Sequence, residues 1–298
     1  MTDERTPKER PFSKYFGKSK LRDFVLAILI ACGVVLFYLA VTSLVALSFD
    51  AALRAASPGA EDAANSLSLK NAGMISLIGN TVALSLGVLF IYILHGNART
   101  SLQLRVVGVR CAAASVILGT AMNLFADAAT RVMPFSENML KSYNETYSFL
   151  GEGNAFVEFV AIAIAAPIVE ETFFRGAVYG ALKRGMPKAA AVVISAAMFG
   201  AAHGNVISFI FTFILGVILA LALDATRSMY VPMMIHISFN ASSYLITEAL
   251  DKTNGGETII LCIGGALLGA SALASLFVLG KTKKSPAPDG TENGDTVK

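Results

Sequence analysis

Several residue types and motifs are missing or rare in this 298-residue sequence, and each absence argues against a particular kind of structure or site. Tryptophan is missing, so any aromatic belt at a membrane interface must be built from tyrosine and phenylalanine. The three cysteines, Cys32, Cys111 and Cys262, show no CxxC or other ligand spacing, which argues against disulfides and a thiolate metal site. We expect them to be small buried hydrophobes, because each lies within or at the end of an apolar run. The zinc-protease signature HExxH is also absent.

Charged residues are scarce at 15%, whereas 55% of the chain is apolar. An apolar segment must be about 20 residues long to cross the hydrocarbon core of a membrane, and the sequence holds several such segments. It therefore predicts an all-α, polytopic membrane bundle of about eight helices and no nucleic-acid partner. The eight spans are expected at 24–49, 72–94, 111–128, 155–184, 189–203, 206–223, 231–247 and 258–279, separated by a loop at 50–70, a polar stretch at 131–154 and shorter turns.

The sequence divides into three parts. Residues 1–22 are predicted to be a basic cytoplasmic arm, 23–280 the transmembrane domain with its motif-bearing core at 155–247, and 281–298 a disordered tail. Lysine and arginine concentrate in the arm and in every second loop thereafter, while the other loops balance fewer basic residues with acids. This is the positive-inside pattern, so both termini are expected in the cytoplasm.

The fourth span carries two adjacent carboxylates and a guanidinium, in the run Glu170-Glu171-Thr172-Phe173-Phe174-Arg175. A charge at bilayer depth costs roughly 2.5–3.5 kcal/mol on insertion scales, so buried charges normally mark function. On a helix, Glu171 and Arg175 lie one turn apart on the same face and can pair. Glu170 points about 100° away and has no local partner. One acid is thus expected to keep its charge while the other acts as a base.

Two of the three histidines also lie inside predicted spans. His203 ends the run Phe199-Gly200-Ala201-Ala202-His203, and His236 shares a helix face with Asn240 one turn later. At ~1.5 Å per residue, Glu170, His203 and His236 fall at a similar depth, in the cytoplasmic half of the bilayer. In this arrangement Glu170 and one imidazole can deprotonate a water, while the other imidazole and the amide can stabilise an oxyanion.

These motifs, Glu-Glu-x-x-x-Arg, Phe-x-x-x-His and His-x-x-x-Asn in three successive spans, resemble the CPBP family of intramembrane endopeptidases, the CAAX-protease and bacteriocin-processing or Abi group. The resemblance covers roughly residues 155–247. It implies that Glu170 is the water-activating base and His203 its partner. It assigns the oxyanion hole to His236 and Asn240, with Glu171, Arg175 and Phe199 in supporting positions.

The resemblance also implies a hydrolase that cuts a peptide bond of a membrane-associated protein or peptide, of CAAX type or of leader or bacteriocin type. A bacterial plasma membrane is the expected location, with the site opening toward the cytoplasmic half. No cofactor is favoured. A zinc site formed by Glu170, His203 and His236 is the alternative, because three protein ligands and an open position make a catalytic zinc centre.

Two other functions compete with proteolysis. A non-catalytic immunity or scaffold protein of the same fold would have no need to bury an unpaired Glu170. A proton-coupled transporter could use buried Glu and His as a relay, but such folds often contain internal repeats, and none is evident between the halves. The polar groups Glu158, Asn123 and Asp127 stay open: Glu158 faces either a cavity mouth or a polar partner, and the other two are either solvated or bonded within the bundle.

Overall fold

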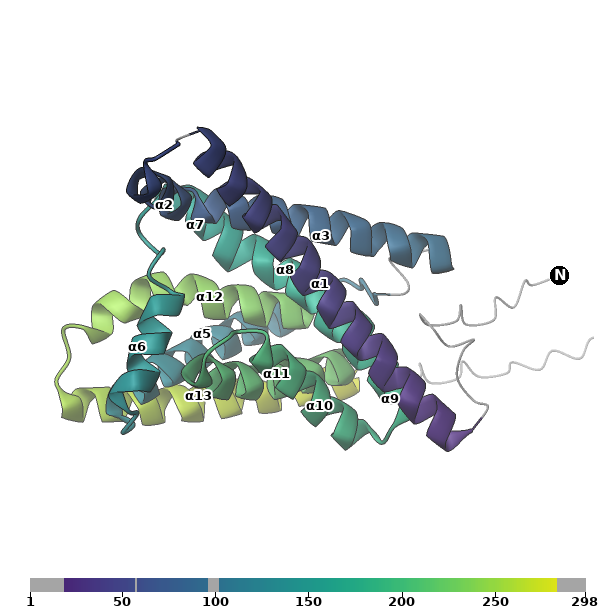
Figure 1. Cartoon of the computed structure of the whole chain (residues 1–298). Coiled ribbons are helices and arrows are strands. Elements are labelled where there is room, and N and C mark those ends of the chain that lie inside the picture. Colours follow the sequence, from purple (N-terminus) through teal and green to yellow (C-terminus); the bar gives the residue numbers. More distant parts are fainter. Residues whose placement is uncertain (1–18, 57, 96–101, 283–298) are drawn as a thin grey trace, which may run out of the picture.

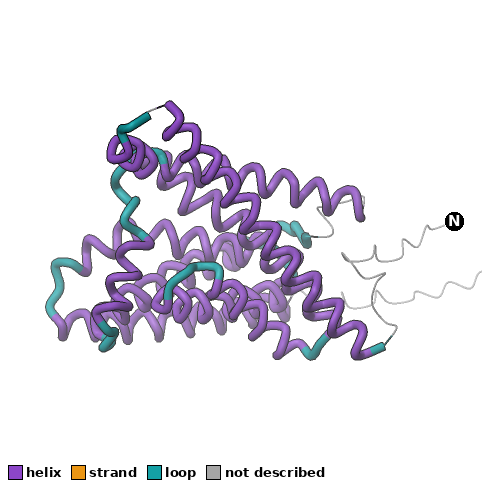
Figure 2. Tube along the Cα trace, in the orientation of Figure 1, coloured by secondary structure: helices purple, strands orange, loops and turns teal. Residues whose placement is uncertain are grey.

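The computed structural model describes residues 19–282 apart from 57 and 96–101, and within these residues every regular element is helical (Figures 1 and 2). The elements are α1 (Lys20–Ala56), α2 (Glu61–Lys70), α3 (Ala72–His95), α5 (Val109–Val132), α6 (Glu137–Thr146), α7 (Ala155–Glu158), η2 (Phe159–Ala165), α8 (Ala166–Glu171), η3 (Thr172–Val178), α9 (Tyr179–Gly185), α10 (Lys188–Ala201), α11 (Val206–Thr226), α12 (Tyr230–Leu250) and α13 (Gly255–Thr282). The predicted all-α class is confirmed.

Five of the described helices are long and apolar enough to cross a membrane: α1, residues 72–89 of α3, α5, α11 and residues 255–280 of α13. Each of the three other predicted spans has a helical counterpart as well. The fourth is a continuous helical run from Ala155 to Gly185, which we call the central helix, made of α7, η2, α8, η3 and α9. The fifth, α10, is apolar but has only 14 residues. The total of eight spans stays a prediction.

Two short helices occupy segments that were expected to be a loop and a polar stretch. In α2, Glu61 and Asp62 lie in the first turn and Lys70 in the last, the order that the helix dipole favours. In α6, the Ser136 hydroxyl accepts a hydrogen bond from the Met139 N–H at 3.4 Å and so caps the helix. Neither segment shows a long apolar run, which is why hydropathy missed both.

Two helices extend a few residues into the segments that were predicted to be the arm and the tail. Helix α1 already begins at Lys20, within the expected basic arm, and α13 continues to Thr282, within the expected tail. The rest of both segments, 1–18 and 283–298, lies outside the described residues. The prediction that the cysteines are buried is confirmed for Cys111. Cys262 is only partly buried, and the prediction is wrong for Cys32, which is exposed.

The helices run between two ends of the bundle (Figure 1). The start of α1, the end of α9, the start of α10 and the ends of α11 and α13 gather at one end, which we call the α9 end. At the opposite end lie α2, α6, the start of the central helix and the α12–α13 connection, and we call this the α6 end. Because each long helix joins one end to the other, the middle of the central helix is enclosed on several sides.

Close packing at the α9 end fixes the central helix in place. The Asp224 carboxylate, at the end of α11, accepts a hydrogen bond from the Tyr179 hydroxyl at 2.6 Å. The same carboxylate pairs with the ammonium groups of Lys183 and Lys188, each at 2.9 Å.

Farther along the bundle, a Cβ on Gly119 of α5 would overlap the backbone of α12 at Ile235, so only glycine allows this approach. The Asp224 contacts thus hold α9, α10 and α11 together, and the Gly119 contact holds α5 against α12, the helix that carries His236 and Asn240.

Candidate active site

The buried centre of the molecule is an ion pair within the central helix. The Arg175 Nε atom lies 3.1 Å from Glu171 Oε2, and the two side chains are 2% and 0% exposed. The pairing predicted from their spacing is therefore present. The guanidinium also donates from Nη2 to the Gly216 carbonyl at 3.4 Å and lies over the Phe199 ring, 4.4 Å from its centroid. Arg175 thus joins the central helix to α10 and α11.

His236 of α12 bridges the two carboxylates. Its Nδ1 lies 3.0 Å from Glu171 Oε1, and its Nε2 lies 3.8 Å from Glu170 Oε2. Glu171 has no proton to donate as a carboxylate, so Nδ1 carries the hydrogen in this contact. The longer distance to Glu170 exceeds that of a direct hydrogen bond. Glu170 is the more accessible acid, with a side chain that is 17% exposed.

The second histidine, His203, also contacts Phe199. The His203 Nδ1 atom lies 2.9 Å from the Phe199 carbonyl oxygen, which leaves Nε2 without a bond to the helix. The Phe199 ring lies 4.9 Å from the His203 ring and 5.6 Å from the His236 ring, edge-on to both. Phe199 is fully buried and therefore acts as a spacer that sets the positions of both imidazoles. Among the contacts of the described residues, Glu170 is paired with His236 rather than with His203.

Asn240 is held by a backbone atom of the central helix. Its Nδ2 donates to the Ile162 carbonyl at 2.9 Å. Ile162 lies in the π-helical stretch η2, where a carbonyl bonds to the N–H five residues later. That residue is Pro167, which has no N–H to donate. The asparagine amide thus satisfies a carbonyl that proline leaves free, and its second amide hydrogen remains available to a ligand.

This contact gives a test of how the amide is positioned. In Pro167→Ala, the new backbone N–H can fill the Ile162 carbonyl and release Asn240. We expect any activity of the site to fall about tenfold to a hundredfold, because small misplacements of a reacting group have effects of that size. Rates would be measured for Pro167→Ala and for Ala165→Gly, a nearby change that adds no donor. Equal rates for Pro167→Ala and the unchanged protein would contradict the positioning role.

The sequence did not identify every group around the site. The sequence alone does not link Pro167 to Asn240, because the link depends on the π-helical register of η2. The sequence also gives no signal for Tyr147, between α6 and α7, whose hydroxyl contacts Ser208 of α11 at 2.9 Å. Burial is the main cause that raises the pKa of Tyr147; the Ser208 hydrogen bond opposes it, and Glu170 adds to the rise.

The sequence did not decide the surroundings of Glu158, Asp127 and Asn123, and the structure shows that Glu158 is fully hydrogen-bonded whereas the other two are not. Glu158 has polar partners: its carboxylate accepts from the N–H groups of Gly151 and Gly153 at 2.9 and 2.8 Å, so it shapes the loop before the central helix. Asp127 faces Arg131 on the same helix at 3.6 Å, but its Oδ2 and the Oδ1 of Asn123 are buried without a hydrogen-bond partner. Unsatisfied buried oxygens of this kind commonly bind ordered water.

The described residues contain no group of three or more His, Cys, Asp and Glu side chains arranged to hold a metal ion. Of the predicted zinc ligands, Glu170 lies near His236, with 3.8 Å between Oε2 and Nε2, whereas His203 bonds through Nδ1 to the Phe199 carbonyl. The donor set in this arrangement does not fit a three-ligand zinc centre.

Comparison with known proteins gives one family. The model of the family "Type II CAAX prenyl endopeptidase Rce1-like" matches residues 152–242, which include every predicted site residue from Glu170 to Asn240. No curated protein and no solved structure matches the chain. The match begins at the loop before the central helix and ends within α12, so α1, α3, α5 and α13 lie outside it.

Proposed function

We propose that the chain is an intramembrane endopeptidase of the CAAX-protease kind, which its residues 152–242 match, and that it hydrolyses a peptide bond with a water activated by Glu170. The observation that carries the proposal is the pairing at the centre of the bundle. Glu171 is neutralised by Arg175 at 3.1 Å, while Glu170 is partly exposed and faces an imidazole nitrogen at 3.8 Å. One carboxylate is structural, and the other is free to take a proton.

In the proposed reaction, Glu170 removes a proton from a water that lies between its carboxylate and the His236 imidazole. The oxygen of that water attacks the carbonyl carbon of the scissile peptide, and the carbonyl π electrons move to its oxygen. The second amide hydrogen of Asn240 and an imidazole N–H stabilise the resulting oxyanion. Collapse of the intermediate breaks the C–N bond, and the proton held by Glu170 passes to the leaving nitrogen.

The roles of the two histidines follow from their bonds. His236 donates from Nδ1 to Glu171 at 3.0 Å, so the ion pair orients its ring and leaves Nε2 directed toward Glu170. His203 donates from Nδ1 to the Phe199 carbonyl at 2.9 Å, so its Nε2 carries a hydrogen for the oxyanion only when the ring is the doubly protonated imidazolium. We therefore assign His236 to the water together with Glu170, and His203 with Asn240 to the oxyanion. This assignment exchanges the two imidazoles relative to the roles that the family resemblance implied.

The matched family is described as acting on CAAX prenyl proteins, and the substrate of this chain is proposed to be a membrane-associated protein or peptide. The experiment compares peptides from membranes and medium of cells that carry the native protein or Glu170→Ala, by mass spectrometry. We expect a set of cleaved termini that disappears with Glu170→Ala although the protein still accumulates. If the cellular phenotype and all termini persist with Glu170→Ala, the chain acts as a non-catalytic scaffold or immunity protein.

Treatment with a metal chelator distinguishes activation of the water by Glu170 from activation by a bound zinc ion. We expect cleavage by the purified protein to survive 1,10-phenanthroline, because Glu170 is the proposed base and the donor set does not form a zinc centre. A known zinc endopeptidase in the same detergent serves as the control for chelation. Loss of cleavage that zinc restores would replace the glutamate mechanism with the zinc alternative at Glu170, His203 and His236.

A further inference from the structure

Helices α1 and α3 lie outside the matched segment 152–242, yet each carries a buried polar side chain into the bundle. Tyr38 of α1 is 8% exposed and Asn80 of α3 is 5% exposed, whereas most other residues of both helices are at least partly exposed. Polar groups buried at membrane depth are costly, and they commonly mark function. Neither side chain has a part in the reaction proposed above.

Hydrogen bonds fix the direction in which the Tyr38 hydroxyl donates. The amide nitrogen of Asn80 donates to the Ser76 carbonyl at 3.0 Å and lies 3.2 Å from the Ser76 hydroxyl oxygen. Because a carbonyl can only accept, the NH₂ group of Asn80 faces Ser76 and its Oδ1 atom faces Tyr38. An amide oxygen cannot donate, so the hydrogen in the 3.2 Å contact between Tyr38 and Asn80 belongs to the Tyr38 hydroxyl. The phenol oxygen therefore keeps its lone pairs but has no hydrogen left for another group.

The Tyr38 ring lies against the side of the central helix that carries Glu170. Its centroid is 5.2 Å from that of Phe173 and 6.4 Å from that of Phe174, which it meets edge-on. Phe174 follows Glu170 by four residues, so their side chains lie on the same side of the helix. The Glu170 carboxylate and the Tyr38 phenol interact electrostatically. Tyr38 is thus the side chain through which α1 reaches the candidate active site.

The face of α3 that carries Asn80 also packs on the central helix. A Cβ on Gly87, two turns after Asn80, would lie 2.8 Å from the Phe173 ring, so glycine makes room for this ring. Leu84, one turn after Asn80, lines an apolar cavity of about 350 Å³ together with Ile168 of the central helix. The Asn80 side chain is therefore directed into the bundle, toward the central helix, rather than toward lipid.

The direction of the Tyr38 O–H bond matters to a general base. A phenol that donated to the Glu170 carboxylate would stabilise its charged form and so oppose the removal of a proton from water. A phenol whose hydrogen is held elsewhere can instead accept a hydrogen bond from Glu170 once the carboxylate has taken the proton, and this favours the transfer. The bond from Tyr38 to Asn80 selects the second case.

We propose that Asn80 is a positioning residue for proteolysis: it holds the hydroxyl hydrogen of Tyr38, so that the phenol oxygen serves Glu170 only as a hydrogen-bond acceptor. This inference rests on the proposed function and adds α1 and α3 to the helices that form its site. When Glu170 takes a proton from the water, its new O–H donates to the Tyr38 oxygen. When that proton passes to the leaving nitrogen, this hydrogen bond is lost again. Neither Tyr38 nor Asn80 gains or loses a proton in the cycle.

Three variants of the full chain in lipid test the role of Asn80, with a synthetic peptide that spans a bond left uncut by Glu170→Ala. Asn80→Leu keeps the approximate size of the side chain but frees the Tyr38 hydrogen to donate to Glu170. We expect its kcat to fall roughly tenfold to hundredfold with KM within about twofold, because hydrogen bonds to charged groups have effects of this size. Tyr38→Phe removes the hydroxyl and should lower kcat only about threefold to tenfold. Tyr38→Phe/Asn80→Leu should match Tyr38→Phe and so cleave faster than Asn80→Leu.

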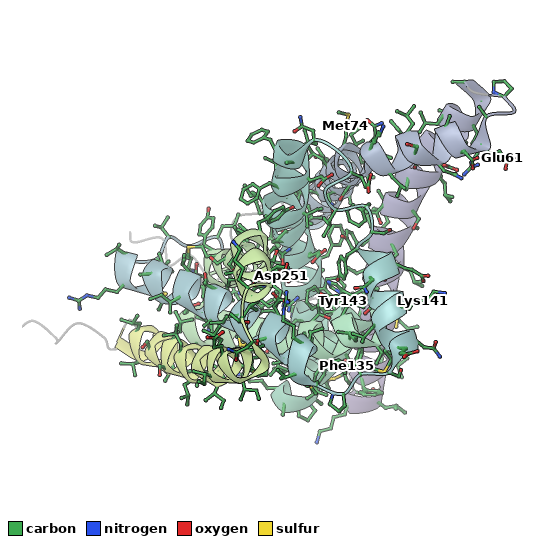
Figure 3. The ribbon with its side chains drawn as sticks, turned by 90° about the vertical axis from the view of Figure 1, so that its left-hand side faces the viewer. Glu61, Met74, Phe135, Lys141, Tyr143 and Asp251 are labelled. Atoms are coloured by element: carbon green, nitrogen blue, oxygen red, sulfur yellow. The ribbon has the colours of Figure 1, made fainter. Side chains whose placement is uncertain are left out.

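The double variant separates this role from a structural one. If Asn80 only supported packing, the double variant would be as slow as Asn80→Leu or slower, and that result would overturn the proposal, as would a native kcat for Asn80→Leu. Tyr143→Phe removes a phenol hydroxyl on α6, where Figure 3 labels the residue, and as the matched control it should leave the rate unchanged. Asn80→Ala provides the same comparison with a smaller side chain if Asn80→Leu does not accumulate in membranes.

Infrared spectroscopy tests the hydrogen bonds without any catalysis. The difference between the spectra of the native protein and Glu170→Gln isolates the carboxylate bands of Glu170. We expect these bands to shift when the same difference is measured in the Asn80→Leu protein, and to return when Tyr38→Phe is added. Bands that stay in place in Asn80→Leu would overturn the role of Asn80 even if Glu170 proves to be the base. A shift in a protein that cleaves no peptide would support the hydrogen-bond network and overturn only the protease assignment.

Discussion

Glu170→Gln is expected to lower the rate of peptide hydrolysis by about 10²–10⁴-fold, the range that a positioned general base contributes. The amide has the shape of the carboxylate but cannot take a proton from water. Glu170 is only partly buried, and its contact with His236 at 3.8 Å is too long to be a strong bond, so the substitution removes little packing. The loss should appear in kcat, with KM nearly unchanged, in a peptide-cleavage assay on the protein in lipid.

Matched controls separate chemistry from folding. Glu170→Gln should accumulate in membranes and melt within a few degrees of the native protein, since no buried ion pair is broken. Glu152→Gln, at an exposed acid before the central helix, should leave the rate unchanged. Activity of Glu170→Gln close to the native rate would remove Glu170 as the base and favour water activation by another group.

The helical class and the pairing of Glu171 with Arg175 could be predicted because each depends on a short stretch of sequence. Long apolar runs predict spanning helices, and a four-residue spacing places an acid and a base on one face. Helices α2 and α6 were missed because neither has a long apolar run and both depend on end effects and tertiary contacts. The π-helical stretches of the central helix have no sequence signal apart from Pro167.

The arrangement of the candidate site depended more on tertiary structure. Depth along each helix predicted that Glu170, His203 and His236 lie at one level, with His203 as the partner of Glu170; the structure places His236 Nε2 3.8 Å from Glu170 Oε2. Depth alone cannot give the rotation of one helix about its axis, so it did not predict which imidazole faces Glu170 or that Phe199 contacts both rings. The contact of Tyr147 with Ser208 joins residues 61 positions apart, and no local pattern identifies such a pair.

Arg175→Met is expected to destabilise the protein by about 3–5 kcal/mol, the cost of leaving a buried charge without its partner. Glu171 is fully buried, and without Arg175 the ionisable partner that remains to it among the described residues is His236. The substitution also removes the guanidinium from the Phe199 ring and from the Gly216 carbonyl. The melting temperature in detergent should fall by on the order of 10 °C, and activity should fall with it because Phe199 and His236 lose their common support.

The double variant Glu171→Gln/Arg175→Met identifies the cause. Removing both charges leaves no buried ion without a partner, and a buried pair replaced by neutral groups is often close to neutral in stability. We therefore expect the double variant to recover most of the melting temperature lost in Arg175→Met. Its activity should stay low, because an amide side chain at position 171 does not orient His236 as the native carboxylate does. Were the double variant as unstable as Arg175→Met, packing of the guanidinium on Phe199, rather than the charge of Glu171, would be the main contribution of Arg175.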